Sequence, residues 1–295
     1  MPMPDIEVAR LRTEYQGPHE TVSTSDGKTL FVRRWNANRE APVSVLIFHG
    51  FTAYSGPYGQ IVANQLADSG FDVFCLDFRG HGLSDGRRGD YPNEQRFVDD
   101  LKETMALVRP KSRKLVLMGH SLGALAAVVA VKNSPAQVDG LVLASAARQI
   151  QPGVYPRRSA GAALKILLAV AVLPGSRVIE YRRQGQMIVP DPLMTYHYSP
   201  RFYSVLFGAS ALKVMRMYSS GLIGSPNITF EHKLPIPLLV TVGDQDELFS
   251  VEEAKKFCES IDCDDKEFHI LAGAKHAVYP EGSWSPLVDW LGRKF

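Results

Sequence analysis

The sequence predicts an α/β fold with a mostly parallel sheet, helices on both faces and one inserted helical segment. Short apolar runs alternate with amphipathic helical patterns along most of the chain, which is typical of parallel strands because they are buried on both faces. One connection, residues 147–231, is too long for a plain loop and has helical periodicity. The 295 residues, 45% of them hydrophobic, suffice for one domain with such an insertion.

The first element that we expect is a hairpin over residues 19–36. It turns at Ser25-Asp26-Gly27-Lys28, where an Asp-Gly pair lies between alternating apolar positions. The remaining strands are expected at 43–48, 71–76, 114–118, 139–144, 237–242 and 267–271. The helices that alternate with them are expected at 57–69, 93–109, 121–132, 250–261 and 284–293.

A serine motif, Gly119-His120-Ser121-Leu122-Gly123, lies between the strand expected at 114–118 and a helix of small residues. A serine on so sharp a turn must adopt a strained backbone, and glycines flank it because side chains there would clash with the neighbouring strand and helix. The turn lifts the Ser121 hydroxyl to the sheet edge. It also places the N–H of Leu122 at a helix N-terminus, where an oxyanion is stabilised. The motif therefore predicts a serine hydrolase.

The partners that such a serine needs follow along the same sheet edge. The strand at 237–242 runs into Gly243-Asp244-Gln245-Asp246-Glu247, and the strand at 267–271 leads to His276. A serine hydroxyl is a weak nucleophile, so an imidazole must take its proton and a buried carboxylate must orient that imidazole. His276 is the expected base. Asp244, Asp246 and Glu247 lie within one turn, so position alone leaves the acid open.

Five motifs in order resemble the monoacylglycerol lipase and lysophospholipase branch of the α/β-hydrolase superfamily, from about Thr21 to Phe295. They are His49-Gly50-Phe51 with the following residues to Tyr58, Asp77-Phe78-Arg79-Gly80-His81-Gly82-Leu83-Ser84, the serine motif, Gly243-x-x-Asp246, and His276. The resemblance implies the α/β-hydrolase fold, Asp246 as the acid, and Phe51 and Leu122 as the residues whose N–H groups form the oxyanion hole. The chain departs from the family's mammalian lipases at Ala53-Tyr54, where they carry a charged pair.

The predicted activity is hydrolysis of carboxylic esters through an acyl-enzyme formed on Ser121. The resemblance implies monoacylglycerols, lysophospholipids or similar esters with one acyl chain. A broad carboxylesterase, a thioesterase or a peptidase would use the same residues, because a triad and an oxyanion hole serve any acyl transfer. A binding protein on the same scaffold would normally lack one member of the triad, and none is missing here.

The other histidines are interpreted as structural groups. His49 and His81, in glycine-flanked loops, are expected to form hydrogen bonds beneath the site, and His120 is expected to pack. His269 lies within a strand pattern, so His276 is preferred as the base. The remaining histidines show no partner spacing, and no metal-ligand motif is present. We therefore expect neither a metal nor a cofactor.

The long connection, residues 147–231, is expected to form a helical cap over the site, with 1–146 and 232–295 as the core domain. It carries ten Lys and Arg but three acids, a formal charge of +7 against +2 for the whole chain. Its apolar run, 161–174, is interrupted by Lys165 and is too short to span a bilayer. Two interpretations stay open: a helix buried against the core, or a lid that contacts lipid. Leu167 and Leu168 are the residues expected to contact substrate or lipid.

Composition bounds the location and partners. Cys75, Cys258 and Cys263 form no disulfide-like framework, which predicts a reducing compartment, and Cys75 is expected to be a buried hydrophobe. Residues 1–7 lack the organisation of a signal peptide, so a cytoplasmic location is expected, with peripheral membrane contact through the cap as an option. A net charge of +2 without a recognised motif argues against nucleic-acid binding.

Overall fold

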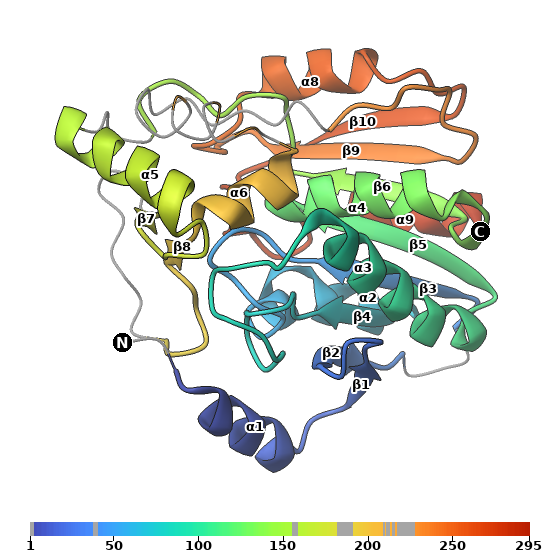
Figure 1. The fold of residues 1–295 in the computed structure, drawn as a ribbon. Helices are drawn as coiled ribbons and strands as arrows, with labels where there is room; N and C mark the ends of the chain where they lie inside the picture. The colour runs from blue at the N-terminus through green and yellow to red at the C-terminus, as the bar shows by residue number, and fades with distance from the viewer. Residues whose placement is uncertain are drawn as a thin grey trace.

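The computed structural model describes residues 3–37, 41–154, 159–181, 191–208, 210, 213, 216 and 228–295. Its centre is an eight-stranded sheet in the order β1-β2-β4-β3-β5-β6-β9-β10 (Figure 1). The bounds are β1 His19–Ser23, β2 Thr29–Trp35, β3 Val43–Phe48, β4 Asp72–Leu76, β5 Lys114–His120, β6 Gly140–Ala144, β9 Leu238–Gly243 and β10 Lys266–Leu271. The strands from β4 to β10 pair in parallel, whereas β1 with β2 and β2 with β4 are antiparallel. The predicted mostly parallel sheet is confirmed.

Helices cover both faces of this sheet. Their bounds are α1 Asp5–Glu14, α2 Asn64–Asp68, α3 Glu94–Val108, α4 Leu122–Asn133, α5 Ala160–Val172, α6 Pro200–Phe207, α8 Val251–Glu259 and α9 Ser285–Lys294. Along β3, Val45 and Ile47 join the cluster that contains α2 and α9, while Leu46 and Phe48 join the cluster that contains α3, α4 and α8. This alternation follows from the two-residue period of a strand, and it gives the sheet one hydrophobic layer on each side.

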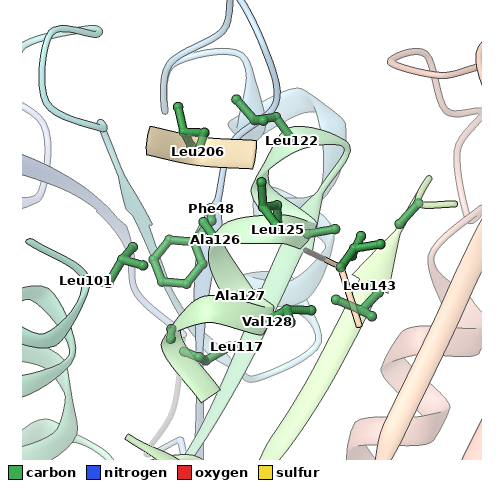
Figure 2. Close-up of a cluster of buried hydrophobic side chains, with 14 of the residues drawn as sticks. Phe48, Leu101, Leu117, Leu122, Leu125, Ala126, Ala127, Val128, Leu143 and Leu206 are labelled. Carbon is green, nitrogen blue, oxygen red and sulfur yellow. The ribbon is translucent and has the colours of Figure 1, made fainter. Parts of the chain in front are cut away.

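Helix α4 begins directly after the serine motif and lies close on the sheet. Figure 2 shows its residues Leu125, Ala126 and Val128 over the side chains of Phe48 and Leu143. Small side chains on α4 allow this close approach, and the residues from Leu122 to Val128 are all buried. The start of α4, and with it the serine turn, is therefore fixed by close packing on the sheet.

The predicted strands and helices agree with the structure to within one or two residues at most ends, with two differences. The helix expected at 57–69 is instead a π-helical turn, Gly59–Ala63, that continues into α2. Helix α1 was not predicted, because its apolar residues do not form one helical face and Val8 is its single buried side chain. It is attached by Arg12, which donates to the carbonyl of Leu83 at 2.7 Å.

The connection between β6 and β9 carries α5, a two-stranded sheet of β7 (Ile179–Glu180) and β8 (His197–Tyr198), and α6. Figure 1 shows α5 at the outer edge of the molecule, with α6 between it and the sheet. Leu167 and Leu168 are 41% and 56% exposed, so the interpretation of α5 as a helix buried against the core is wrong for these residues. Parts of the expected cap, including Arg157, Arg158, Arg182 and Arg183, lie outside the described residues.

Candidate active site

Ser121 occupies the tight turn between β5 and α4. Its backbone has φ 56° and ψ −118°, which is the strained conformation that the motif predicts. A Cβ atom on Gly119 would lie 2.3 Å from the carbonyl oxygen of Gly123, and one on Gly123 would lie 1.9 Å from that of Phe48. Both positions therefore require glycine, because the helix and the neighbouring strand approach too closely for a side chain.

The structure brings Ser121, His276 and Asp246 together in a line. His276 Nε2 lies 3.0 Å from Ser121 Oγ, and His276 Nδ1 lies 3.0 Å from Asp246 Oδ2. Asp246 also accepts the N–H groups of Leu248 at 2.8 Å and Phe249 at 3.0 Å. Burial alone would raise the pKa of Asp246, but the contact with His276 and these N–H donors lower it below its usual value. Asp246 is therefore ionised beside the imidazole.

The two neighbouring acids lie differently. Asp244 is exposed at the surface, whereas Asp246 is buried. Glu247 is also exposed, and its carboxylate accepts the backbone N–H of His276 at 3.0 Å rather than a ring nitrogen. The ring of His276 thus has Asp246 as its carboxylate partner.

The loop after β3, which carries Gly50 and Phe51, lies against Ser121. A Cβ atom on Gly50 would lie 3.2 Å from the Cβ of Ser121, which shows how closely this loop approaches the serine. Gly50 is held by its N–H, which donates to the hydroxyl of Tyr58 at 2.8 Å. Phe51, the next residue, lines both cavities that open on Ser121, and Leu122 lines one of them.

Two cavities meet at Ser121. The larger, about 430 Å³, lies on the side of His276, and its walls include Gln60, Ile61, Tyr196 and Val278. The smaller, about 40 Å³, is apolar and lies over the start of α4. Its walls include Leu122, Leu125, Ala146, Ala147, Ile150, Tyr181, Phe207, Ile228 and Phe249, with Arg148 at its edge. Ser121 therefore has a roomy side next to the imidazole and a narrow apolar side away from it.

The prediction that His120 only packs is wrong, because its ring also forms hydrogen bonds. Its Nδ1 lies 2.7 Å from the hydroxyl of Tyr58, and its Nε2 lies 2.8 Å from the carbonyl oxygen of His276. Burial and the neighbouring His276 lower the pKa of His120 to about 3, so the ring is neutral. Because a carbonyl only accepts, Nε2 carries the proton, and Nδ1 accepts from Tyr58. These hydrogen bonds connect the Gly50 loop, the serine turn and the His276 loop.

His49, His81 and His269 have the structural surroundings that the sequence predicts for them. His49 is fully buried; its Nδ1 donates to the carbonyl of Gly50 at 2.8 Å, and its Nε2 accepts the N–H of Phe78 at 3.2 Å. Burial lowers the pKa of His49 to about 4, and burial likewise lowers that of His81. His269 lies on β10 and pairs with Glu267 at 3.2 Å. Within the described ranges, no three His, Cys, Asp or Glu side chains gather as metal ligands would.

This chain is similar to known proteins in sequence and in fold. A family model described as serine aminopeptidase, S33, matches residues 39–283. The monoglyceride lipase of Rattus norvegicus is 25% identical over 295 residues, covering 95% of this chain and 90% of that protein. The monoacylglycerol lipase of Mycolicibacterium smegmatis is 25% identical over 262 residues, covering 86% and 88%. A soluble variant of Saccharomyces cerevisiae monoglyceride lipase, solved with a substrate analogue, superposes with a TM-score of 0.70 at 17% identity, covering 95% and 94%.

Proposed function

The chain belongs to the serine aminopeptidase S33 family, and on that premise we propose that it hydrolyses carboxylic esters with one acyl chain, such as monoacylglycerols and lysophospholipids. The observation that carries this proposal is the 3.0 Å contact between Ser121 Oγ and His276 Nε2 at the meeting of the two cavities. The lipases of rat and Mycolicibacterium smegmatis, which match this chain over most of their length, support the choice of substrate.

The reaction begins when Ser121 Oγ attacks the ester carbonyl while His276 takes the hydroxyl proton. Asp246, bonded to Nδ1, holds the imidazole in the required tautomer and stabilises its positive charge. The N–H groups of Phe51 and Leu122 hold the tetrahedral oxyanion. His276 then protonates the departing alcohol, and a water molecule activated by the same imidazole releases the fatty acid from Ser121.

We assign the two ends of the substrate to the two cavities. The alcohol must leave on the side of His276, because His276 protonates it, so it occupies the larger cavity. The carbonyl end of the acyl group then lies on the other side of Ser121, next to the narrow apolar cavity and the aromatic rings of Phe207 and Phe249, where about 40 Å³ of space admits the first few carbon atoms of the chain. Apolar walls favour an acyl chain because its burial contributes about 0.8 kcal/mol for each CH₂ group.

A peptidase is the second candidate, because the family description names aminopeptidases. Such an enzyme must hold the ammonium group of its substrate, whereas the described walls bring apolar and aromatic side chains and the cation Arg148 toward Ser121. These walls favour a neutral acyl ester. A panel of monoacylglycerol, lysophosphatidylcholine, an acyl thioester and an aminoacyl nitroanilide tests the assignment. Turnover of the nitroanilide alone would replace esterase by peptidase.

We assign residues 147–231 to a cap that also contacts lipid. Leu164, Leu168 and Val172 follow one another at intervals of four residues on α5 and are 55%, 56% and 71% exposed. An apolar stripe of this kind is suited to a headgroup boundary, and the basic residues of the cap are suited to anionic lipid. No helix in the described part of the chain is long and apolar enough to cross a bilayer. Three free, buried cysteines support a cytoplasmic location.

A further inference from the structure

The loop that carries Phe51 is held from the cap side through the backbone of Thr52. Thr52 has φ 63°, in the left-handed region that β-branched residues seldom adopt. Its N–H donates to the hydroxyl of Tyr198 at 2.9 Å, and its carbonyl accepts the N–H of Thr195 at 3.1 Å. The Tyr198 hydroxyl donates in turn to the carbonyl of Thr195 at 2.8 Å. Such an unfavourable backbone persists where its surroundings impose it, and here the cap segment does so.

The side chain of Phe51 is also enclosed by the cap segment. Its ring stacks on that of Tyr181, with the centroids 4.1 Å apart and the planes 9° from parallel. Tyr198 meets the same ring edge-on at 5.1 Å, and Phe207 lies at 6.1 Å. Because both the side chain of Phe51 and the backbone of its neighbour are bound by the cap segment, the direction of the Phe51 N–H depends on that segment.

Tyr198 is buried, and the residues that follow it are bonded to the core domain. Its side chain is fully buried on β8. The next residue, Ser199, donates its N–H to the carbonyl of Gly89 at 2.8 Å and its hydroxyl to Asp90 at 2.5 Å. The guanidinium of Arg201 pairs with the same carboxylate. The hydroxyl of Tyr198 is therefore a fixed point against which the Phe51 loop is set.

We propose that Tyr198 is a positioning residue for the oxyanion hole: its hydroxyl holds Thr52 in the left-handed conformation that aims the Phe51 N–H at the substrate oxygen. The inference rests on the proposed function, because it needs Phe51 as an oxyanion donor. It extends that function by making the oxyanion hole a joint product of the core domain and the cap segment. In this arrangement the cap segment acts on the chemical step as well as on substrate binding.

Replacing Tyr198 by Phe tests the proposal, because the ring is kept and the hydroxyl is lost. Loss of an oxyanion donor lowers kcat by about 10² to 10³, so a misdirected one is expected to lower it by about tenfold to a hundredfold. KM should change by less than about threefold, because the interaction is made in the transition state. Affinity for a boronic acid that mimics the tetrahedral state should fall with kcat. The pH profile of kcat should stay in place, since the contacts of His276 are untouched.

Tyr91→Phe is the matched control. Tyr91 is equally buried and its hydroxyl donates to Asp100 at 2.6 Å, away from Ser121, so its loss should lower the melting temperature without lowering kcat. If Tyr198→Phe fails to fold, Tyr54→Phe tests the same coupling, because the Tyr54 hydroxyl joins the loop to Asp191 at 2.8 Å. Its kcat should fall in the same direction.

Several results would overturn the proposal. An unchanged kcat in Tyr198→Phe, or a rise in KM alone, would reduce Tyr198 to a packing residue. An equal fall of kcat in Tyr91→Phe would show that general loosening is responsible. A wild-type protein that hydrolyses no ester fails at an earlier point, because that result contradicts the proposed function itself.

Discussion

The segment between β6 and β9, which we propose as the cap segment, has two parts with opposite surroundings. In β8 and α6, Tyr198 and Phe202 are buried, and Ser199 and Arg201 bind the carboxylate of Asp90 on the core domain. In α5, Ile166 is buried, but the leucines on its outer face are exposed. Hydrogen bonds and ion pairs hold a segment in one geometry. An exposed apolar surface, in contrast, indicates a site that contacts a lipid, a ligand or another protein. One insertion thus combines a part suited to positioning with a part suited to contact.

The largest expected effect is the loss of ester hydrolysis in Ser121→Ala. This activity is the reference for the predictions on both parts of the cap segment. Ser121→Ala removes the proposed nucleophile, and loss of a triad member costs about 10⁴ to 10⁶ in turnover. The fold should survive, because one hydroxyl is lost from a turn whose glycines remain. Hydrolysis of a monoacylglycerol and labelling by a fluorophosphonate measure the effect. Residual activity above about a tenth of wild type would reject Ser121 as the nucleophile.

The next effect concerns Asp246, the proposed acid, which follows β9 and lies outside the proposed cap. Asp246→Asn should lower kcat by at least about a hundredfold, because an amide cannot hold His276 in the required tautomer. Asp244→Asn, a matched change two residues away on an exposed side chain, should have a much smaller effect. Circular dichroism checks that both variants fold. The reverse order of losses would move the acid to Asp244.

The anchored part of the cap should respond mainly through stability. Phe202→Ala removes a ring that is 1% exposed and lies against Tyr198 at 4.6 Å and His81 at 5.8 Å. Truncating a buried Phe to Ala costs about 3 to 5 kcal/mol in the free energy of unfolding. All substrates should be affected alike, because the change loosens the backing of Tyr198. A thermal melt measures the loss, and an unchanged melting temperature would contradict the anchored role of α6.

The core domain was more predictable from the sequence than the cap because its signals are local. Short strand runs set the sheet, and the crowding at Gly119 and Gly123 is already implied by a serine between a strand and a helix. The role of His120 was missed because its partners are distant in sequence: Tyr58 lies 62 residues away and His276 lies 156 residues away. Alternation along a strand gives a direction for a side chain but does not identify what it meets.

The same limit applies to the contact between the cap and the oxyanion loop. Thr52 and Tyr198 are 146 residues apart, and neither lies in a pattern that pairs them. The left-handed backbone of Thr52 is also unexpected for a β-branched residue. A signal was present in the aromatic content of the segment, where Tyr196, Tyr198, Phe202 and Tyr203 lie within eight positions. Such a cluster indicates a buried surface, but tertiary structure is needed to identify what it covers.

The smallest effect on the fold is expected in α5, and it separates the two parts of the cap most sharply. Replacing Leu164 and Leu168 by Ser removes apolar surface that is already 55% and 56% exposed, so the melting temperature should change little. Binding to anionic vesicles should fall, as should activity on dispersed long-chain monoacylglycerol, while a short soluble ester is spared because it needs no interface. Added salt should weaken the remaining attraction, since basic residues contribute about 1 kcal/mol each near an anionic surface.

Co-sedimentation with anionic and neutral vesicles, beside a thermal melt, measures these effects. If wild type binds neither vesicle, α5 is not a lipid contact; if the double variant melts early and loses all substrates alike, α5 belongs with the anchored part.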